Sequence, residues 1–232
     1  MKKYADRLRQ ALSESHTLAR RLDDPGFPIE ELAVVQDWQR ERLEKSYREL
    51  TDQQRYRAAG DFFLTQLYGG LHFRERDQEM ERVLPVMVRM LRDDMLLALA
   101  ESFELQTLSF GFDMEMAAAL QQSHWNTLDT SRYGALYRTV GRSSDRERQI
   151  ELIRHLGMKL NSLVHHRLVL LLIRTLRGPA RAAGFGLLQS FLEQGLFAFR
   201  EMGDGTVFVE TIWRKEGEVM QRLFAGEDDP FA

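Results

Sequence analysis

The run LVLLLI, residues 168–173, closes a segment of helical periodicity that begins near Ser144. The first half of that segment places apolar residues at spacings of 3, 4 and 7, which predicts a helix with one buried face. In the run itself the polar face vanishes, and a helix that is apolar on all sides must be surrounded by other elements. Arg167 and Arg174 bracket a stretch far shorter than the roughly 18–20 apolar residues that cross a bilayer. We therefore predict a central core helix over residues 144–176.

The rest of the chain shows the same periodicity in segments separated by short connectors, which is typical of antiparallel helices. Gly111 is expected to interrupt the helix that follows Asp93, and Pro85 to kink or break the helix before it. No flexible linker or fixed-period repeat divides the chain. We predict an all-α protein: a single compact multi-helix domain over residues 1–225, packed around the central helix, with a loose acidic tail at 226–232.

Composition narrows the functional classes. The 232 residues are 44% hydrophobic and 29% charged, which is ordinary for a globular domain that buries a core. A formal net charge of -3 does not favour generic nucleic-acid binding, which rests on neutralising phosphates. The chain has no cysteine and no signal-peptide pattern, and we expect a cytoplasmic protein that does not insert into a membrane.

Residues 55–69 read RYRAAGDFFLTQLYG, and this stretch resembles the signature of a bacterial family named after its FFLEELY motif. The motif here reads FFLTQLY, with Thr65 and Gln66 in place of two acidic residues. Residues 76–91, 137–150 and 178–202 resemble the same family. The resemblance implies no activity and therefore no catalytic residues.

The sequence contains none of the patterns that carry familiar catalysis. No Glu-x-x-His or His-Glu-x-x-His unit is present, and no Gly-x-Ser-x-Gly elbow follows a strand. His155, His165 or His166 could ligate a haem iron, but a helical histidine is more often hydrogen-bonded or exposed. We expect no catalytic residues, no metal and no cofactor.

Arginines gather around the start of the predicted central helix, where they could hold a phosphate or a carboxylate. Asp145 and Glu147 lie in the same turn, so a solvated salt-bridge network is the favoured interpretation. Only Arg142 and Arg146 are expected to share a helix face. The candidate ligand-binding residues are Tyr68, Arg138, Arg142 and Arg146.

Two further patterns predict structure. Glu101 and Glu104 lie within a mainly apolar run, so one of them is expected to face inward with an arginine partner. The small residues between Gly178 and Gly186 are expected to let two helix backbones approach closely, since glycine within a helix otherwise costs about 1 kcal/mol.

These observations favour a non-enzymatic protein–protein interaction or regulatory module. The partner would be an unidentified protein, and a homodimer of this chain is one possible form of the interaction. The alternative is a helical protein that binds a small molecule or a cofactor such as haem. Its pocket would lie between helices 52–68 and 144–176.

Overall fold

The computed structural model describes residues 2–63, 73–184 and 186–232, and every regular element among them is a helix. The predicted all-α class is confirmed. The helices are α1 (Ala5–Arg20), the 3-10 turn η1 (Arg21–Asp23), α2 (Ile29–Thr51), α3 (Gln54–Phe62), α4 (Phe73–Met90), α5 (Asp93–Ser123), α6 (Thr130–Val140), α7 (Ser143–Leu163), α8 (Arg167–Ala182), α9 (Gly186–Met202) and α10 (Thr206–Ala225).

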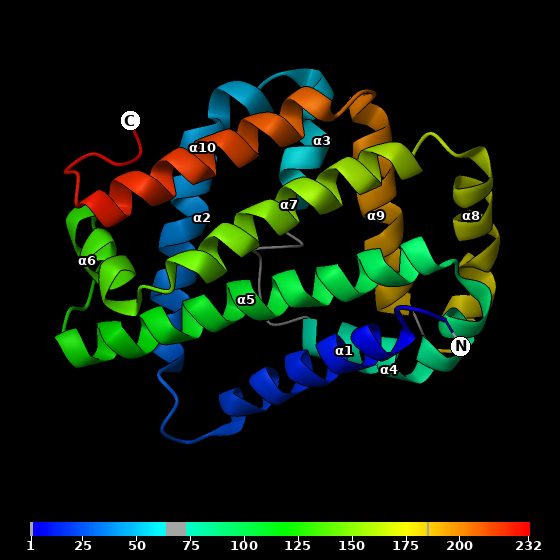
Figure 1. Ribbon diagram of the computed structural model, residues 1–232, viewed down its shortest axis with the longest axis horizontal. Helices are drawn as coiled ribbons and strands as arrows, with labels where there is room; N and C mark the ends of the chain where they lie inside the picture. The colour runs from blue at the N-terminus through cyan, green and yellow to red at the C-terminus, as the bar shows by residue number, and fades with distance from the viewer. Residues whose placement is uncertain (1, 64–72, 185) are drawn as a thin grey trace.

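The central helix is α5, which spans 31 residues and packs against α1, α2, α6 and α7. Figure 1 shows it running through the middle of the bundle, with α1 on one side and α7 on the other. Gly111 does not interrupt it, although the sequence predicted that it would. Gly111 lies against α1, where an added Cβ would reach Leu18 at 3.8 Å, and contacts on several sides of α5 offset the low helix propensity of glycine. Pro85 likewise lies inside α4 without ending that helix.

The segment predicted as one central helix over 144–176 is two helices, α7 and α8, separated at residues 164–166. Val164 is buried there while His165 and His166 are exposed. The break contains neither glycine nor proline, so the sequence carries no breaker signal at that point. The prediction of one continuous helix was therefore wrong.

The apolar run 168–173 is also not at the centre of the molecule. It lies in α8, which packs against α9 at one end of the bundle (Figure 1). Val169 and Ile173 pack inward, whereas Leu171 is 59% exposed. The first part of the predicted helix, now α7, does lie among α5, α9 and α10. The continuous helical periodicity of residues 144–176 therefore includes one interior helix and one peripheral helix.

Close backbone packing occurs away from the predicted segment 178–186. An added Cβ at Gly178 would meet nothing within 4 Å, and Gly184, whose φ is +81°, has only an Arg82 nitrogen at 4.0 Å. One tight position is Gly195 of α9, where a Cβ would lie 2.8 Å from the ring of Phe62 in α3. A glycine at that position lets α3 and α9 pack side by side.

The acidic tail folds back onto the bundle near its end. Phe231 packs with its ring centroid 5.6 Å from that of Trp38 and 6.1 Å from that of Tyr133. The Arg42 guanidinium lies 5.4 Å from the same ring, and Arg222 donates a hydrogen bond to the carbonyl of Ala232. The tail therefore packs against Arg42 and Tyr133, two residues that line an internal cavity.

Candidate functional site

The three predicted arginines lie near one another in sequence but do not converge in space. Arg138 donates a hydrogen bond to the Leu223 carbonyl at 2.9 Å, and Arg142 contacts Glu115 at 2.5 Å and Asp145 at 2.8 Å on the surface. Arg146 alone points into the protein. The fourth predicted residue, Tyr68, lies outside the described residues.

Arg146 is only 5% exposed. Its guanidinium carbon lies 3.6 Å from the ring centroid of Tyr137 and 4.2 Å from that of Phe112. Its Nε donates a hydrogen bond to the Gly141 carbonyl at 3.1 Å, but Nη2 has no hydrogen-bond partner among the described residues. The aromatic rings favour the cation through their negative faces, so they stabilise a charge that burial alone would disfavour.

A second arginine, Arg42 of α2, is also buried beside these rings. Its Nη1 and Nη2 donate to Glu216 of α10 at 2.6 and 3.1 Å, and the Tyr47 hydroxyl donates to the same carboxylate at 2.6 Å. Burial, the largest single influence, would by itself lower the pKa of Arg42. The charge of Glu216, its hydrogen bonds to Arg42 and the nearby tyrosines Tyr133 and Tyr47 together outweigh burial, so the pKa is raised. The Nε of Arg42 has no hydrogen-bond partner among the described residues.

Asp113 of α5 lies in the same region and makes no salt bridge among the described residues. Its carboxylate accepts hydrogen bonds from the amides of Gln39 at 2.9 Å and Gln36 at 3.1 Å. Burial raises the pKa of Asp113 to about 6, although the two amides and the charge of Arg146 oppose the shift. We call Arg42, Asp113, Arg146 and Glu216 the internal charge cluster.

The internal charge cluster lines a cavity of about 40 Å³ between α2, α5, α6, α7 and α10. The other walls are aromatic and aliphatic side chains together with the polar residues Gln39, Ser109 and Gln149. None of the lining residues comes from α3, so this cavity is not the pocket expected between helices 52–68 and 144–176. Sequence reasoning missed Arg42, Asp113 and Glu216, although Asp113 stands out as a carboxylate within the otherwise apolar run FGFDM.

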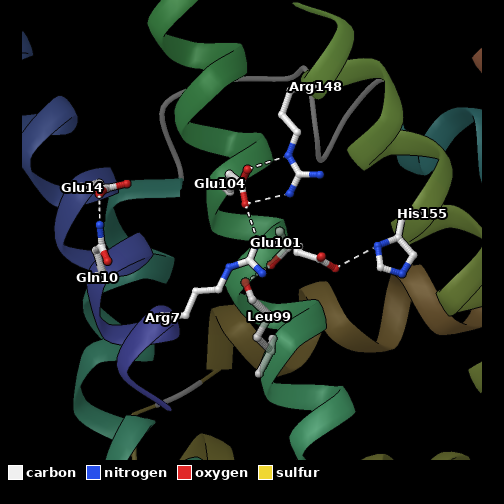
Figure 2. Close-up of polar contacts among 9 residues, drawn as sticks. Arg7, Gln10, Glu14, Leu99, Glu101, Glu104, Arg148 and His155 are labelled. Atoms are coloured by element: carbon white, nitrogen blue, oxygen red, sulfur yellow. Dashed lines mark hydrogen bonds and ion pairs between the residues drawn. The ribbon is translucent and has the colours of Figure 1, made fainter. Parts of the chain in front are cut away.

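Figure 2 shows the two carboxylates of α5, Glu101 and Glu104, which point to different partners. Glu104 accepts hydrogen bonds from Arg148 at 2.8 and 3.2 Å and from Arg7 at 2.9 Å, so it joins α1, α5 and α7. The bond to Arg148, followed by that to Arg7, lowers the pKa of Glu104. The sequence predicted an arginine partner for the inward-facing carboxylate. That prediction was wrong, because the arginine partners belong to Glu104, which is more exposed than Glu101.

Glu101 is the buried member of the pair, at 5% exposure. Its Oε2 lies 3.0 Å from Nδ1 of His155 in α7, whose side chain is 45% exposed (Figure 2). The two groups form an ion pair only when His155 is protonated, and Oε2 of Glu101 has no hydrogen-bond partner among the described residues. The contact links α5 to α7 in a way that sequence spacing did not predict.

The α8–α9 surface is the second candidate site, because it combines exposed apolar side chains with arginines. The guanidinium of Arg174 lies 5.3 Å from the ring centroid of Phe197, which is 40% exposed. Leu171 lies one helical turn before Arg174 and therefore on the same face of α8. Arg174, Phe197, Arg200 and Glu201 line an open hollow of about 390 Å³.

Comparison with known proteins identifies one family whose matched region includes both candidate sites. The family described as "Domain of unknown function (DUF8198)" matches residues 18–230. The chain belongs to this family. No curated protein and no solved structure matches it. The match covers the internal charge cluster and the α8–α9 surface of this DUF8198 protein, and it carries no activity to them.

Among residues 2–63, 73–184 and 186–232, no group of three or more His, Asp or Glu side chains is placed to hold a metal ion. No helix within the same ranges combines the length and the apolar character that a membrane crossing requires.

Proposed function

We propose that this DUF8198 protein is a non-enzymatic, cytoplasmic interaction module that binds an acidic segment of a partner protein at the α8–α9 surface. The observation that carries the proposal is the contact between Arg174 and the exposed ring of Phe197, one turn from the exposed Leu171. Aromatic residues and arginine contribute most of the binding energy in many protein interfaces.

Charge complementarity specifies the kind of partner. Residues 164–202 contain five arginines and no lysine against two glutamates and no aspartate, while the whole chain carries a formal charge of -3. Arg177 is engaged by Glu193 at 2.6 Å, but Arg174 and Arg200 are exposed and make no salt bridge among the described residues. A basic surface on an acidic protein attracts an acidic segment and repels further copies of the same basic surface.

The apolar side chains define the second requirement. Leu171 and Phe197 leave enough ring and methyl surface in water that a purely ionic partner would not cover it. A segment with carboxylates flanking one or more apolar side chains satisfies both features. Glu201 also lines the hollow, and it would disfavour a partner carboxylate placed directly opposite it.

The test compares two fluorescent synthetic peptides of equal length and identical leucine spacing, with either glutamate or lysine at the polar positions. We expect the acidic peptide to bind with an affinity that falls as salt increases, and the basic peptide not to bind. Arg174→Glu should weaken binding by about tenfold or more, whereas Glu201→Gln should strengthen it. Arg214→Glu is the matched control, because Arg214 is an exposed arginine on α10 that pairs with Glu218.

A photocrosslinking residue in place of Leu171, used in cells of the source organism, identifies the natural occupant. Crosslinks to an acidic, leucine-containing segment of another protein support the proposal. Crosslinks only to a second copy of this chain, retention on anionic lipid vesicles without peptide binding, or competition by duplex DNA would each overturn it.

A further inference from the structure

The internal charge cluster has two donors that nothing among the described residues satisfies. They are Nη2 of Arg146 and Nε of Arg42, and both belong to side chains at least nine-tenths buried. A buried N–H without a partner costs free energy, and the cost is larger for a charged group. Both arginines line the same 40 Å³ cavity.

The net charge of the internal charge cluster depends on whether the Asp113 carboxyl carries a proton. With Asp113 ionised, two arginines face two carboxylates and the cluster is neutral. The partners are unequal, however, because Glu216 is held by Arg42 and Tyr47 whereas Asp113 accepts only from the uncharged amides of Gln36 and Gln39. When Asp113 carries a proton, the buried cluster holds one excess positive charge.

We propose that the cavity binds one small monovalent anion, of the size of chloride or formate, together with one proton on Asp113. The anion accepts hydrogen bonds from Arg146 Nη2 and Arg42 Nε, and the proton removes the carboxylate charge that would repel it. Charge-assisted bonds of this kind are stronger than those between neutral groups. The exchange is balanced, because one anion and one proton enter a cluster that remains neutral.

The size of the cavity limits the ligand. A single water molecule needs a cavity volume of roughly 10–15 Å³. The cavity of about 40 Å³ therefore holds a halide or an anion of about three heavy atoms. Sulfate esters, nucleotides and gluconate are too large. Ser109 and Gln149 line the cavity, are partly exposed, and are joined by a hydrogen bond of 2.7 Å, so they mark the route from solvent.

The polar and titratable groups around Asp113 come from four helices, α2, α6, α7 and α10. They are Gln36, Gln39 and Arg42 of α2, Tyr133 and Tyr137 of α6, Arg146 of α7 and Glu216 of α10. The tyrosines stay neutral, because burial raises the pKa of Tyr133 and of Tyr137. The pKa of Asp113, raised to about 6 by burial, places the charge change of its carboxyl near neutral pH.

The experiment measures thermal unfolding of the full chain while sodium chloride replaces sodium gluconate at constant ionic strength, at about pH 5.5 and about pH 7.5. We expect a saturable rise in melting temperature with chloride at the lower pH. The apparent affinity should weaken by about tenfold per pH unit above the pKa of Asp113, as coupling to one proton requires. Asp113→Asn, which removes the carboxylate charge permanently, should bind chloride equally at both pH values.

Arg146→Met should abolish the chloride effect, and Arg142→Gln, the neighbouring surface arginine, should retain it. Should Arg146→Met not fold, Asp113→Asn decides the question. Crystals in sodium bromide should show an anomalous peak beside the Arg146 guanidinium.

A melting temperature that ignores the identity of the anion indicates that water fills the cavity and overturns the proposal. A bromide peak without a saturable shift in solution means an adventitious ion only, which also overturns it. Chloride binding that remains pH-dependent in Asp113→Asn would refute the coupling to that carboxyl. None of these outcomes depends on the α8–α9 surface, so this inference and the proposed function are tested separately.

Discussion

The guanidinium carbon of Arg146 lies 3.6 Å from the ring centroid of Tyr137, inside the bundle, while Arg142 four residues earlier lies on the surface with Glu115 and Asp145. The two arginines share a helical spacing but not an environment. Arg142 is the N-cap residue of α7 in the left-handed conformation, so its side chain leaves in a different direction from that of a helical residue. An anion that enters the interior therefore meets Arg146 rather than Arg142.

The burial of Arg146 predicts a strong effect on stability. Arg146→Ala should lower the free energy of unfolding by about 2–4 kcal/mol, because it removes the stem packing, the ring contacts and the bond to Gly141. Arg142→Ala should cost less than about 1 kcal/mol, as expected of an exposed ion pair. Urea unfolding followed by circular dichroism measures both. Equal effects of the two substitutions would contradict the placement of Arg146 in the core.

The raised pKa of Asp113 predicts that the stability of the fold decreases as the pH rises. Its pKa is raised from 3.8 to about 6 in the folded protein, so the protonated carboxyl stabilises the fold below about pH 4. That stability is lost as the pH rises through 6, and the loss is on the order of 3 kcal/mol. In gluconate buffer, Asp113→Asn should thus be more stable than wild type at pH 7.5, and the difference should vanish near pH 4.

Urea unfolding at the two pH values measures this difference. The asparagine side chain introduced by Asp113→Asn keeps one acceptor oxygen for Gln39, and rotation of the Gln36 amide supplies an acceptor for its NH₂ group. A variant that is less stable than wild type at pH 7.5 would therefore contradict the raised pKa of Asp113.

Gly195 predicts a steric effect at the α3–α9 contact. Gly195→Ala places a methyl group 2.8 Å from the ring of Phe62 and should cost about 1–3 kcal/mol, because the buried ring must move. Gly217→Ala in α10 is the matched control, since nothing lies within 4 Å of its added Cβ. That control should stabilise the protein by roughly 0.5–1 kcal/mol through helix propensity. Differential scanning calorimetry separates the two, and equal shifts would show that α3 and α9 are not closely packed.

Phe231 predicts that the tail contributes to stability. Phe231→Ala should lower the free energy of unfolding by about 1–2 kcal/mol, because it removes the ring contacts with Trp38, Tyr133 and the Arg42 guanidinium. In a background without Trp125 and Trp213, the emission of Trp38 should shift to longer wavelength. Unchanged emission and stability would mean that the tail does not pack in solution.

The helical periodicity of the sequence was sufficient to predict an all-α fold and most helix positions. Residues one turn apart lie on the same face of a helix whatever surrounds it, so the spacing of Leu8, Leu12 and Ser15 along α1 is a local property. Local chemistry also limited the candidate sites, since the absence of metal-binding and nucleophile motifs can be read from residue spacing alone.

Only the tertiary structure decided which helix lies at the centre and which arginine lies inside. The run 168–173 and the helix α5 are both apolar, but α5 has neighbours on several sides whereas α8 packs against α9. Burial is a property of what surrounds a side chain, and the residues that surround Arg146, Asp113 and Arg42 come from five helices that span residues 29–225. The charges that define the internal cluster, and the pKa of Asp113, follow from that assembly rather than from any one segment.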